Sequence, residues 1–185
     1  MTYQWNTASP EETIALAKRI GERLRPGDCI AYRGDLGAGK TTFTRGLAIG
    51  MGLGDCVTSP TFALVHEYGE PPLAGASQCA AGGTKVGGEP PLAGASQCAA
   101  SGTKVGGEPP RLIHFDMYRI MDETELETTG FYDYPQDECV FAVEWSENIE
   151  AALPPHTMHL TLTRTGDESR TITLEGDERF ADIGT

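Results

Sequence analysis

The fold of this chain is decided by the stretch Gly34-Asp35-Leu36-Gly37-Ala38-Gly39-Lys40-Thr41, which matches the P-loop pattern G-x-x-x-x-G-K-[ST]. Residues 28–33 have the pattern of a short buried strand, and residues 42–51 that of a helix closed by Gly52. Glycines let consecutive backbone N–H groups turn toward one anion, and the start of a helix adds its positive end. The motif in this context predicts nucleotide binding through Asp35, Leu36, Gly37, Ala38, Gly39, Lys40, Thr41 and Thr42.

Two side chains of the motif bring specific chemistry. Lys40 is expected to reach the β- and γ-phosphates as a point charge, which makes it a catalytic candidate. The hydroxyl of Thr41 is expected to ligate Mg²⁺. The chain has no Asn-Lys-x-Asp run, the pattern whose aspartate binds guanine in GTPases, so ATP is favoured over GTP.

The composition narrows the class of protein. A length of 185 residues suits a single P-loop domain over residues 1–185. The net charge of −13 argues against direct binding of nucleic acid, which needs clustered Lys and Arg, so any such role would be indirect. The five cysteines form no C-x-x-C pair and indicate reduced thiols in the cytoplasm. No apolar run is long enough for a signal peptide or a membrane span, so no membrane partner is expected.

Apolar periodicity predicts an α/β fold around the P-loop. Ser9, Pro10 and Glu12 mark the start of a helix that ends before Pro26. Residues 158–162 and 170–175 alternate and are joined by a turn, which predicts an antiparallel hairpin, and the last ten residues are expected to be a frayed tail. Further strands are expected at residues 62–68, 111–116 and 139–143, and short helices at residues 122–130 and 146–153.

Residues 69–110 differ in kind from the rest of the chain. A 19-residue unit, GEPPLAGASQCAAGGTKVG, fills residues 69–87, and residues 88–106 repeat it with Ser101 in place of Gly82. The segment is rich in Gly, Pro, Ala and Ser and has few bulky apolar residues, so it cannot form a core. We predict a flexible, disordered insertion in a surface loop, with a partner-docking arm as the alternative.

Nucleotide chemistry also needs an acidic residue at the end of a buried strand. Asp116 and Glu144 each follow an apolar strand, and in an α/β sheet both would lie at the carboxyl edge beside the P-loop. They are the remaining catalytic candidates, with a solvated strand-end carboxylate as the alternative for each. His114 is interpreted as structural, and Trp145 either covers the nucleotide or packs.

Residues 58–61 place three hydroxyl groups on a short loop after the P-loop helix. Switch segments of P-loop proteins lie at this position and sense the γ-phosphate through Mg²⁺. An ordinary Ser-Pro turn would have the same sequence, so both interpretations stay open.

Five stretches together resemble the TsaE family, formerly YjeE, of bacterial P-loop ATPases in tRNA threonylcarbamoyladenosine synthesis. They occur in family order and are residues 34–46, 58–62, 114–119, 127–130 and 143–145. The P-loop is shared with many families, whereas the Ser-Pro-Thr, His-Phe-Asp-x-Tyr-Arg and Glu-Trp segments together are specific. The chain departs from the family's pattern at the insertion between Tyr68 and Arg111, where relatives have a short turn.

The resemblance implies a small ATPase with a mixed sheet, in which Thr41 and Glu144 hold Mg²⁺ and Asp116 is needed for activity. It also implies two protein partners, TsaD and TsaB, which transfer threonylcarbamoyl to the adenosine beside the anticodon of tRNA. In the family, ATP hydrolysis resets this complex between turnovers. We therefore expect an ATPase that is slow alone and stimulated by its partners.

Two other functions stay open. A small-molecule kinase also has a P-loop, but such kinases commonly carry an arginine-rich lid, and the arginines of this chain are scattered. A nucleotide-occupancy switch would regulate a partner without significant turnover.

Overall fold

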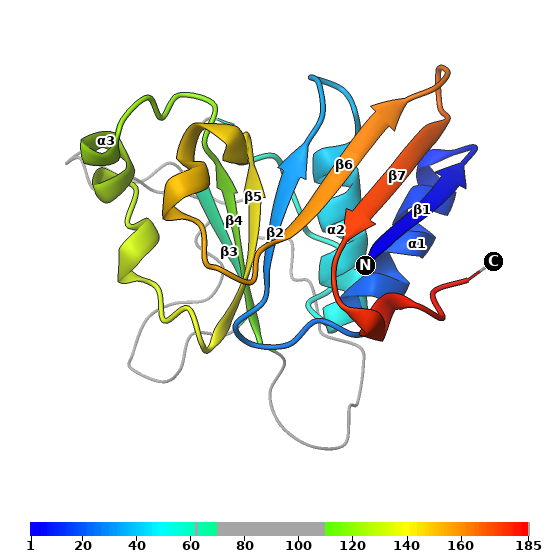
Figure 1. Cartoon of the computed structure of the whole chain (residues 1–185), viewed down its shortest axis with the longest axis horizontal. Helices are drawn as coiled ribbons and strands as arrows, with labels where there is room; N and C mark the ends of the chain where they lie inside the picture. Colours follow the sequence, from blue (N-terminus) through cyan, green and yellow to red (C-terminus); the bar gives the residue numbers. More distant parts are fainter. Residues whose placement is uncertain (62, 70–109, 185) are drawn as a thin grey trace, which may run out of the picture.

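Seven strands form one mixed β-sheet in this computed structural model, which describes residues 1–61, 63–69 and 110–184 (Figure 1). The strands are β1 (Thr2–Thr7), β2 (Cys29–Arg33), β3 (Val65–Tyr68), β4 (Arg111–Asp116), β5 (Cys139–Glu144), β6 (Met158–Arg164) and β7 (Arg170–Glu175). The α-helices are α1 (Pro10–Gly21), α2 (Lys40–Met51) and α3 (Glu123–Thr128), and the 3₁₀ helices are η1 (Phe131–Asp133), η2 (Ser146–Ala152) and η3 (Glu178–Phe180).

The strand order is β1-β7-β6-β2-β5-β4-β3. The central strand β2 is parallel to both of its neighbours, β5 and β6, and β4 is parallel to β5. The outer pairs β1–β7, β6–β7 and β3–β4 are antiparallel. The carboxyl ends of β2, β4 and β5 therefore meet at one edge of the sheet, which is where ligands bind in open α/β folds.

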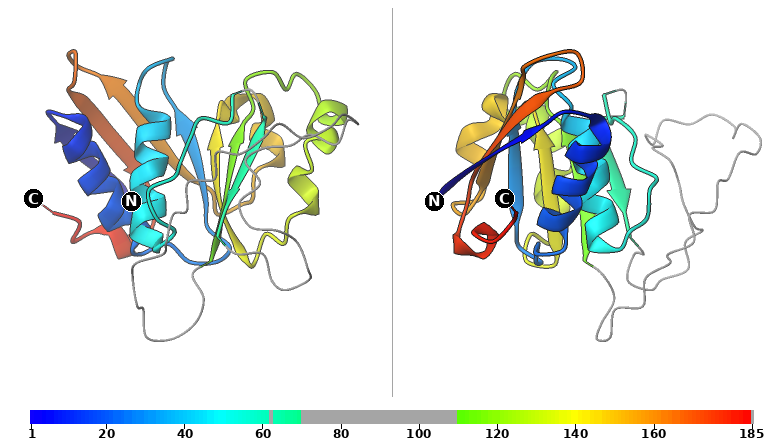
Figure 2. Two further views of the ribbon diagram at one scale, coloured as in Figure 1. Left: turned by 180° about the vertical axis from the view of Figure 1, so that it is seen from behind. Right: turned by 90° about the vertical axis from the view of Figure 1, so that its right-hand side faces the viewer.

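Helices cover the sheet on both faces. Figure 2 shows α1 and α2 together on one face and η2 on the other. A hydrophobic core lies on each face of the sheet, and side chains of β5 point alternately into the two cores. Val140 packs in the core under α1 and α2, whereas Phe141 packs in the core under α3, η1 and η2. The continuous apolar run that predicted a strand buried on both faces is thereby confirmed.

Helix α1 begins and helix α2 ends as their sequences predict, whereas α1 ends already at Gly21, before the predicted stop at Pro26. The Ser9 hydroxyl accepts a hydrogen bond from the Glu12 amide at 3.2 Å, and Pro10 occupies the first turn of α1. Helix α2 ends at Gly52, which adopts the left-handed conformation. The helices pack closely, because a Cβ atom at Gly50 would overlap the backbone carbonyl oxygen of Lys18.

Several expectations require correction. The strand predicted from residue 62 begins only at Val65, because Leu64 has a φ of 68° and its amide donates to the Pro60 carbonyl in a turn. Residue 62 itself lies outside the described residues. The helix expected over residues 146–153 is a 3₁₀ helix, and strand β1 was not expected.

The last ten residues, expected to be a frayed tail, pack against the sheet up to residue 184. The side chain of Phe180 is fully buried, and that of Ile183 nearly so. The indole N–H of Trp5 donates to the Ile183 carbonyl oxygen at 2.6 Å. Burial of these apolar side chains ties the segment to β1, so its polar composition was misleading.

The α/β fold class is confirmed, as is the antiparallel hairpin formed by β6 and β7. Apart from its first and last residues, the predicted insertion at residues 69–110 lies outside the described residues. No helix in the described ranges is long and apolar enough to cross a bilayer.

Candidate active site

The P-loop connects the end of β2 to the start of α2, as the motif predicts. Gly37 and Gly39 have φ angles of 79° and 105°, a backbone conformation that residues with a Cβ atom rarely adopt. Gly39 is the N-cap of α2 and makes no side-chain capping bond, so the first amides of the helix remain directed at the loop. This backbone arrangement is typical of a phosphate nest.

Lys40 is the first residue of α2 and is 5% exposed. Its Nζ donates to the carbonyl oxygens of Gly34 at 2.8 Å and Asp35 at 3.1 Å. The ammonium group also lies 4.6 Å from the ring centroid of Trp145. Among the described residues, no carboxylate pairs with this ammonium group, so its charge is held beside the loop by carbonyl oxygens and an aromatic face.

Glu144 is brought to the P-loop from the end of β5. Its Oε1 accepts a hydrogen bond from Thr41 Oγ1 at 3.0 Å and lies 2.9 Å from His114 Nε2. Glu144 is 4% exposed and His114 is fully buried. A hydroxyl group and a carboxylate thus lie side by side at the mouth of the loop. Both offer oxygen ligands of the kind that Mg²⁺ prefers.

Asp116 lies directly beside Glu144, because the two residues are paired in the register of β4 and β5. Its Oδ2 accepts from Thr61 Oγ1 at 2.8 Å, and its Oδ1 accepts from the Tyr118 amide at 3.0 Å. The guanidinium of Arg119 donates to the Thr61 carbonyl oxygen at 2.5 Å. Residues 58–61 are the candidate switch segment, and Asp116 holds residue 61 of this segment against the site.

The other end of the candidate switch segment is bound to β3. The Thr58 amide donates to the hydroxyl of Tyr68 at 3.2 Å, and His66 Nδ1 lies 3.2 Å from Thr58 Oγ1. Partial burial lowers the pKa of His66 below its ordinary value, and the nearby His114 acts in the same direction. The hydrogen bond that the Thr58 carbonyl oxygen accepts from His66 Nδ1 opposes this shift of the pKa.

His114 contacts a candidate catalytic carboxylate, although its sequence suggested only a structural role. If Nε2 donates to Glu144, Nδ1 carries the lone pair, and Nδ1 has no partner in the described structure. A signal for this contact was present, because residues 114 and 116 share one face of a strand. The missing information was the pairing that sets Asp116 opposite Glu144.

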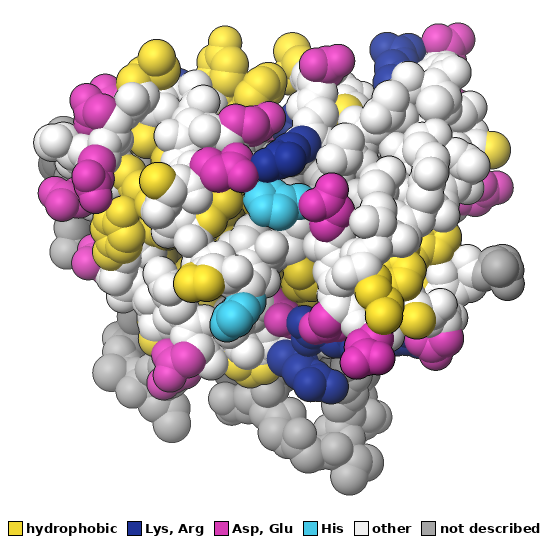
Figure 3. Space-filling model, in the orientation of Figure 1, with side chains coloured by type: hydrophobic (Ala, Val, Ile, Leu, Met, Phe, Trp, Pro, Cys, Tyr) yellow, Lys and Arg dark blue, Asp and Glu magenta, His cyan; other side chains and the backbone are white. Residues whose placement is uncertain are grey.

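Exposed apolar side chains surround the same edge of the sheet. Leu36 is 91% exposed, Tyr118 58% and Met121 80%. The rings of Tyr118 and Trp145 are 5.1 Å apart between centroids. Figure 3 shows hydrophobic side chains gathered along this upper edge of the molecule. Trp145 packs on Tyr118 and faces Lys40, so it stands at the rim of the site.

The chain matches one protein family over most of its length. The family model described as "Threonylcarbamoyl adenosine biosynthesis protein TsaE" matches residues 7–76 and 103–172. The tRNA threonylcarbamoyladenosine biosynthesis protein TsaE of Bacillus subtilis is 35% identical over 171 residues, which cover 92% of this chain and 84% of that relative. The TsaE protein of Streptomyces coelicolor is 31% identical over 171 residues, covering 90% of this chain and 92% of the relative.

A solved structure agrees with the sequence match. The crystal structure of Bacillus subtilis YdiB is similar with a TM-score of 0.62 and 29% identity, and the match covers 99% of this chain and 91% of that one. The chain therefore belongs to the TsaE family of tRNA threonylcarbamoyladenosine biosynthesis proteins.

Proposed function

We propose that this chain binds and hydrolyses ATP with Mg²⁺ as an accessory protein of tRNA threonylcarbamoyladenosine synthesis in the cytoplasm. Its hydrolysis resets a complex of the TsaD and TsaB proteins, and tRNA is reached only through that complex. The observation that carries the proposal is the 3.0 Å hydrogen bond between Thr41 Oγ1 and Glu144 Oε1. It joins the P-loop to a strand-end carboxylate 103 residues away, which is the pair of groups that nucleotide hydrolysis requires.

The donor set fits a magnesium ion. Mg²⁺ is bound in such sites by one or two protein oxygen ligands together with substrate phosphates and water. Thr41 and Glu144 would hold it, because their oxygen atoms already lie together at the start of α2. When bound, the ion neutralises charge on the β- and γ-phosphates.

The other candidate residues have distinct roles in this proposal. Lys40 Nζ, now bonded to two loop carbonyls, is placed to exchange them for phosphate oxygens and to stabilise the charge that develops there. Asp116 acts on the Thr61 hydroxyl, to which it is bonded, and so fixes the segment that faces the γ-phosphate. His114 orients the Glu144 carboxylate through its own hydrogen bond.

Turnover with and without partners tests the proposal. ATP binding is measured by calorimetry in the presence and absence of Mg²⁺, and phosphate release is then measured with purified TsaD and TsaB. We expect binding by the chain alone, slow release, and clear acceleration by the two partners. A high basal rate unchanged by the partners would favour a self-sufficient ATPase or a kinase. Binding without any turnover in the complex would leave a nucleotide-occupancy switch.

A further inference from the structure

Arg170, at the start of β7, contacts the P-loop from outside the motif. Its Nε donates to the Ala38 carbonyl oxygen at 2.8 Å, and its Nη2 donates to the Gly37 carbonyl oxygen at 3.3 Å. Its Nη1 donates to the Ser169 carbonyl oxygen at 2.8 Å in the turn between β6 and β7. The guanidinium therefore bridges the P-loop and the hairpin turn, both of which stand at the upper edge of the molecule in Figure 2.

The charge of Arg170 is directed only at carbonyl oxygens. Within the described ranges it pairs with no carboxylate, whereas Arg164, its register partner on β6, pairs with Asp167. Arg170 is partly buried and Arg164 is exposed. A partly buried arginine whose partners are all carbonyl oxygens orders the backbone segments that carry them. Its planar guanidinium fixes the positions of two acceptors at once.

The contacts determine where the amides of the loop point. A trans peptide directs its C=O and its N–H to opposite sides, and no described peptide bond is cis. Holding the Ala38 carbonyl toward Arg170 therefore turns the Gly39 N–H away from Arg170. No acceptor in the described part of the chain receives a hydrogen bond from the Gly39 amide. The cation on the carbonyl side also polarises these peptide groups, which strengthens their N–H donors.

We infer that Arg170 is a positioning residue of the P-loop, which orients the Gly39 amide toward bound phosphate and couples the loop to the β6–β7 turn. The consequence for nucleotide binding rests on the proposed function, but the ordering of the loop does not. Arg170 lies 130 residues after the motif lysine, so no P-loop pattern includes it.

Two variants and a matched control test this inference. Arg170→Met removes the charge and the fork, and Arg170→Lys keeps the charge but replaces the rigid planar fork by a single ammonium group on a flexible stem. Arg164→Met removes an arginine of the same hairpin whose hydrogen bonds, within the described residues, go to Gly166 and Asp167 in the turn and not to the P-loop. Amide hydrogen exchange over residues 34–41 is measured without nucleotide, and ATP affinity is measured by calorimetry with Mg²⁺.

Both Arg170 variants are expected to speed exchange in the loop roughly tenfold and to weaken ATP binding by a similar factor, because charge-assisted hydrogen bonds that order the loop are lost. Arg164→Met should leave both quantities at the wild-type level. Wild-type exchange rates in both Arg170 variants would overturn the inference. Wild-type exchange and ATP affinity in Arg170→Lys alone would overturn it too, because they would leave only an effect of charge.

Absence of ATP binding by the wild-type protein would refute the proposed function instead, and the exchange rates alone would then decide the role of Arg170. Should Arg170→Met fail to fold, Arg170→Lys gives the same decision.

Discussion

Replacing Glu144 by glutamine separates the chemistry of the site from its architecture. The side chain keeps its shape, and its amide oxygen can still accept from Thr41 and from His114. What is lost is the negative charge, and with it the proposed Mg²⁺ ligand and candidate base. The variant should therefore fold and bind nucleotide but hydrolyse it poorly.

The change in stability can be worked out from the contacts. Each of the two hydrogen bonds falls from about 1.5–3 kcal/mol, with a charged acceptor, to about 0.5–1.5 kcal/mol with a neutral one. The loss of about 2–3 kcal/mol is offset because a carboxylate that is 4% exposed no longer has to be buried. The free energy of unfolding should change by no more than about 1 kcal/mol, which corresponds to roughly 2–4 °C in Tm.

The change in hydrolysis should be far larger. Loss of a positioned acid–base group commonly costs about 10²–10⁴ in rate, so phosphate release in the complex with TsaD and TsaB should fall by roughly a hundredfold or more. The assays are thermal unfolding, calorimetry with ATP and single-turnover phosphate release.

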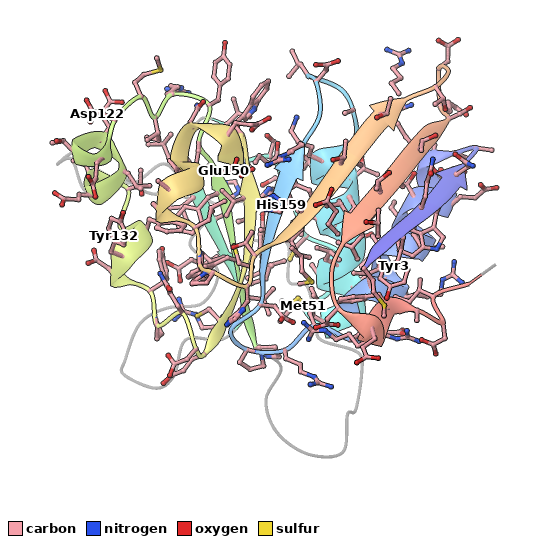
Figure 4. The ribbon with its side chains drawn as sticks, in the orientation of Figure 1. Tyr3, Met51, Asp122, Tyr132, Glu150 and His159 are labelled. Atoms are coloured by element: carbon pink, nitrogen blue, oxygen red, sulfur yellow. The ribbon has the colours of Figure 1, made fainter. Side chains whose placement is uncertain are left out.

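A glutamate on the same domain provides the control for this substitution. Glu150→Gln makes the same chemical change at a half-exposed residue that pairs with Arg33. Figure 4 shows Glu150 on η2, on the sheet face opposite α2. Hydrolysis at the wild-type rate by Glu144→Gln, or an equal loss in Glu150→Gln, would refute the assignment of Glu144.

Three further predictions follow from other contacts. Lys40→Ala should weaken ATP binding by about 2–4 kcal/mol with the fold intact, because it removes the cation at the loop, and equal affinities by calorimetry would contradict this. Gly50→Ala should lower the free energy of unfolding by about 1–3 kcal/mol in denaturant titrations, although alanine favours helices, because its Cβ would overlap the carbonyl of Lys18 and separate α1 from α2. Because burial lowers the pKa of His66 from 6.5, its contribution to stability is present above that pH and is lost as the pH falls through the lower folded pKa. Unfolding at several pH values should show a steeper decline for the wild type than for His66→Gln, and equal slopes would exclude this group.

Much of the fold was predictable because local patterns and tertiary structure agree. The P-loop, the caps of α1 and α2 and the doubly buried β5 each follow from residues within one short segment. The same holds for the two strand-end carboxylates, since an apolar run that ends in an acid marks the carboxyl edge of a sheet. Asp116 and Glu144 are indeed neighbours there.

The remainder depends on partners that are distant in sequence. Strand β1 and the segment that follows β7 are ordered by each other, through the contact of Trp5 with Ile183 and the burial of Phe180. Strand β3 begins late because Leu64 adopts a left-handed turn that no local residue preference predicts. Arg170 is a single arginine in a half-solvated hairpin, and only the folded chain brings it to the P-loop.

Strand alternation explains why the candidate groups converge on one face. On β4, the side chains of His114 and Asp116 face α2, whereas Phe115 between them is buried in the opposite cluster. On β5, Glu144 faces α2 while Val143 is buried on the other side. Sliding either strand by one residue would move its candidate residues to the far face and place apolar side chains at the P-loop. The packing of Phe115 and Val143, both fully buried, therefore fixes the register and holds the two carboxylates beside Thr41. The geometry of the site is in this sense a property of the core, and substitutions that loosen this cluster should impair the site even though they do not touch it.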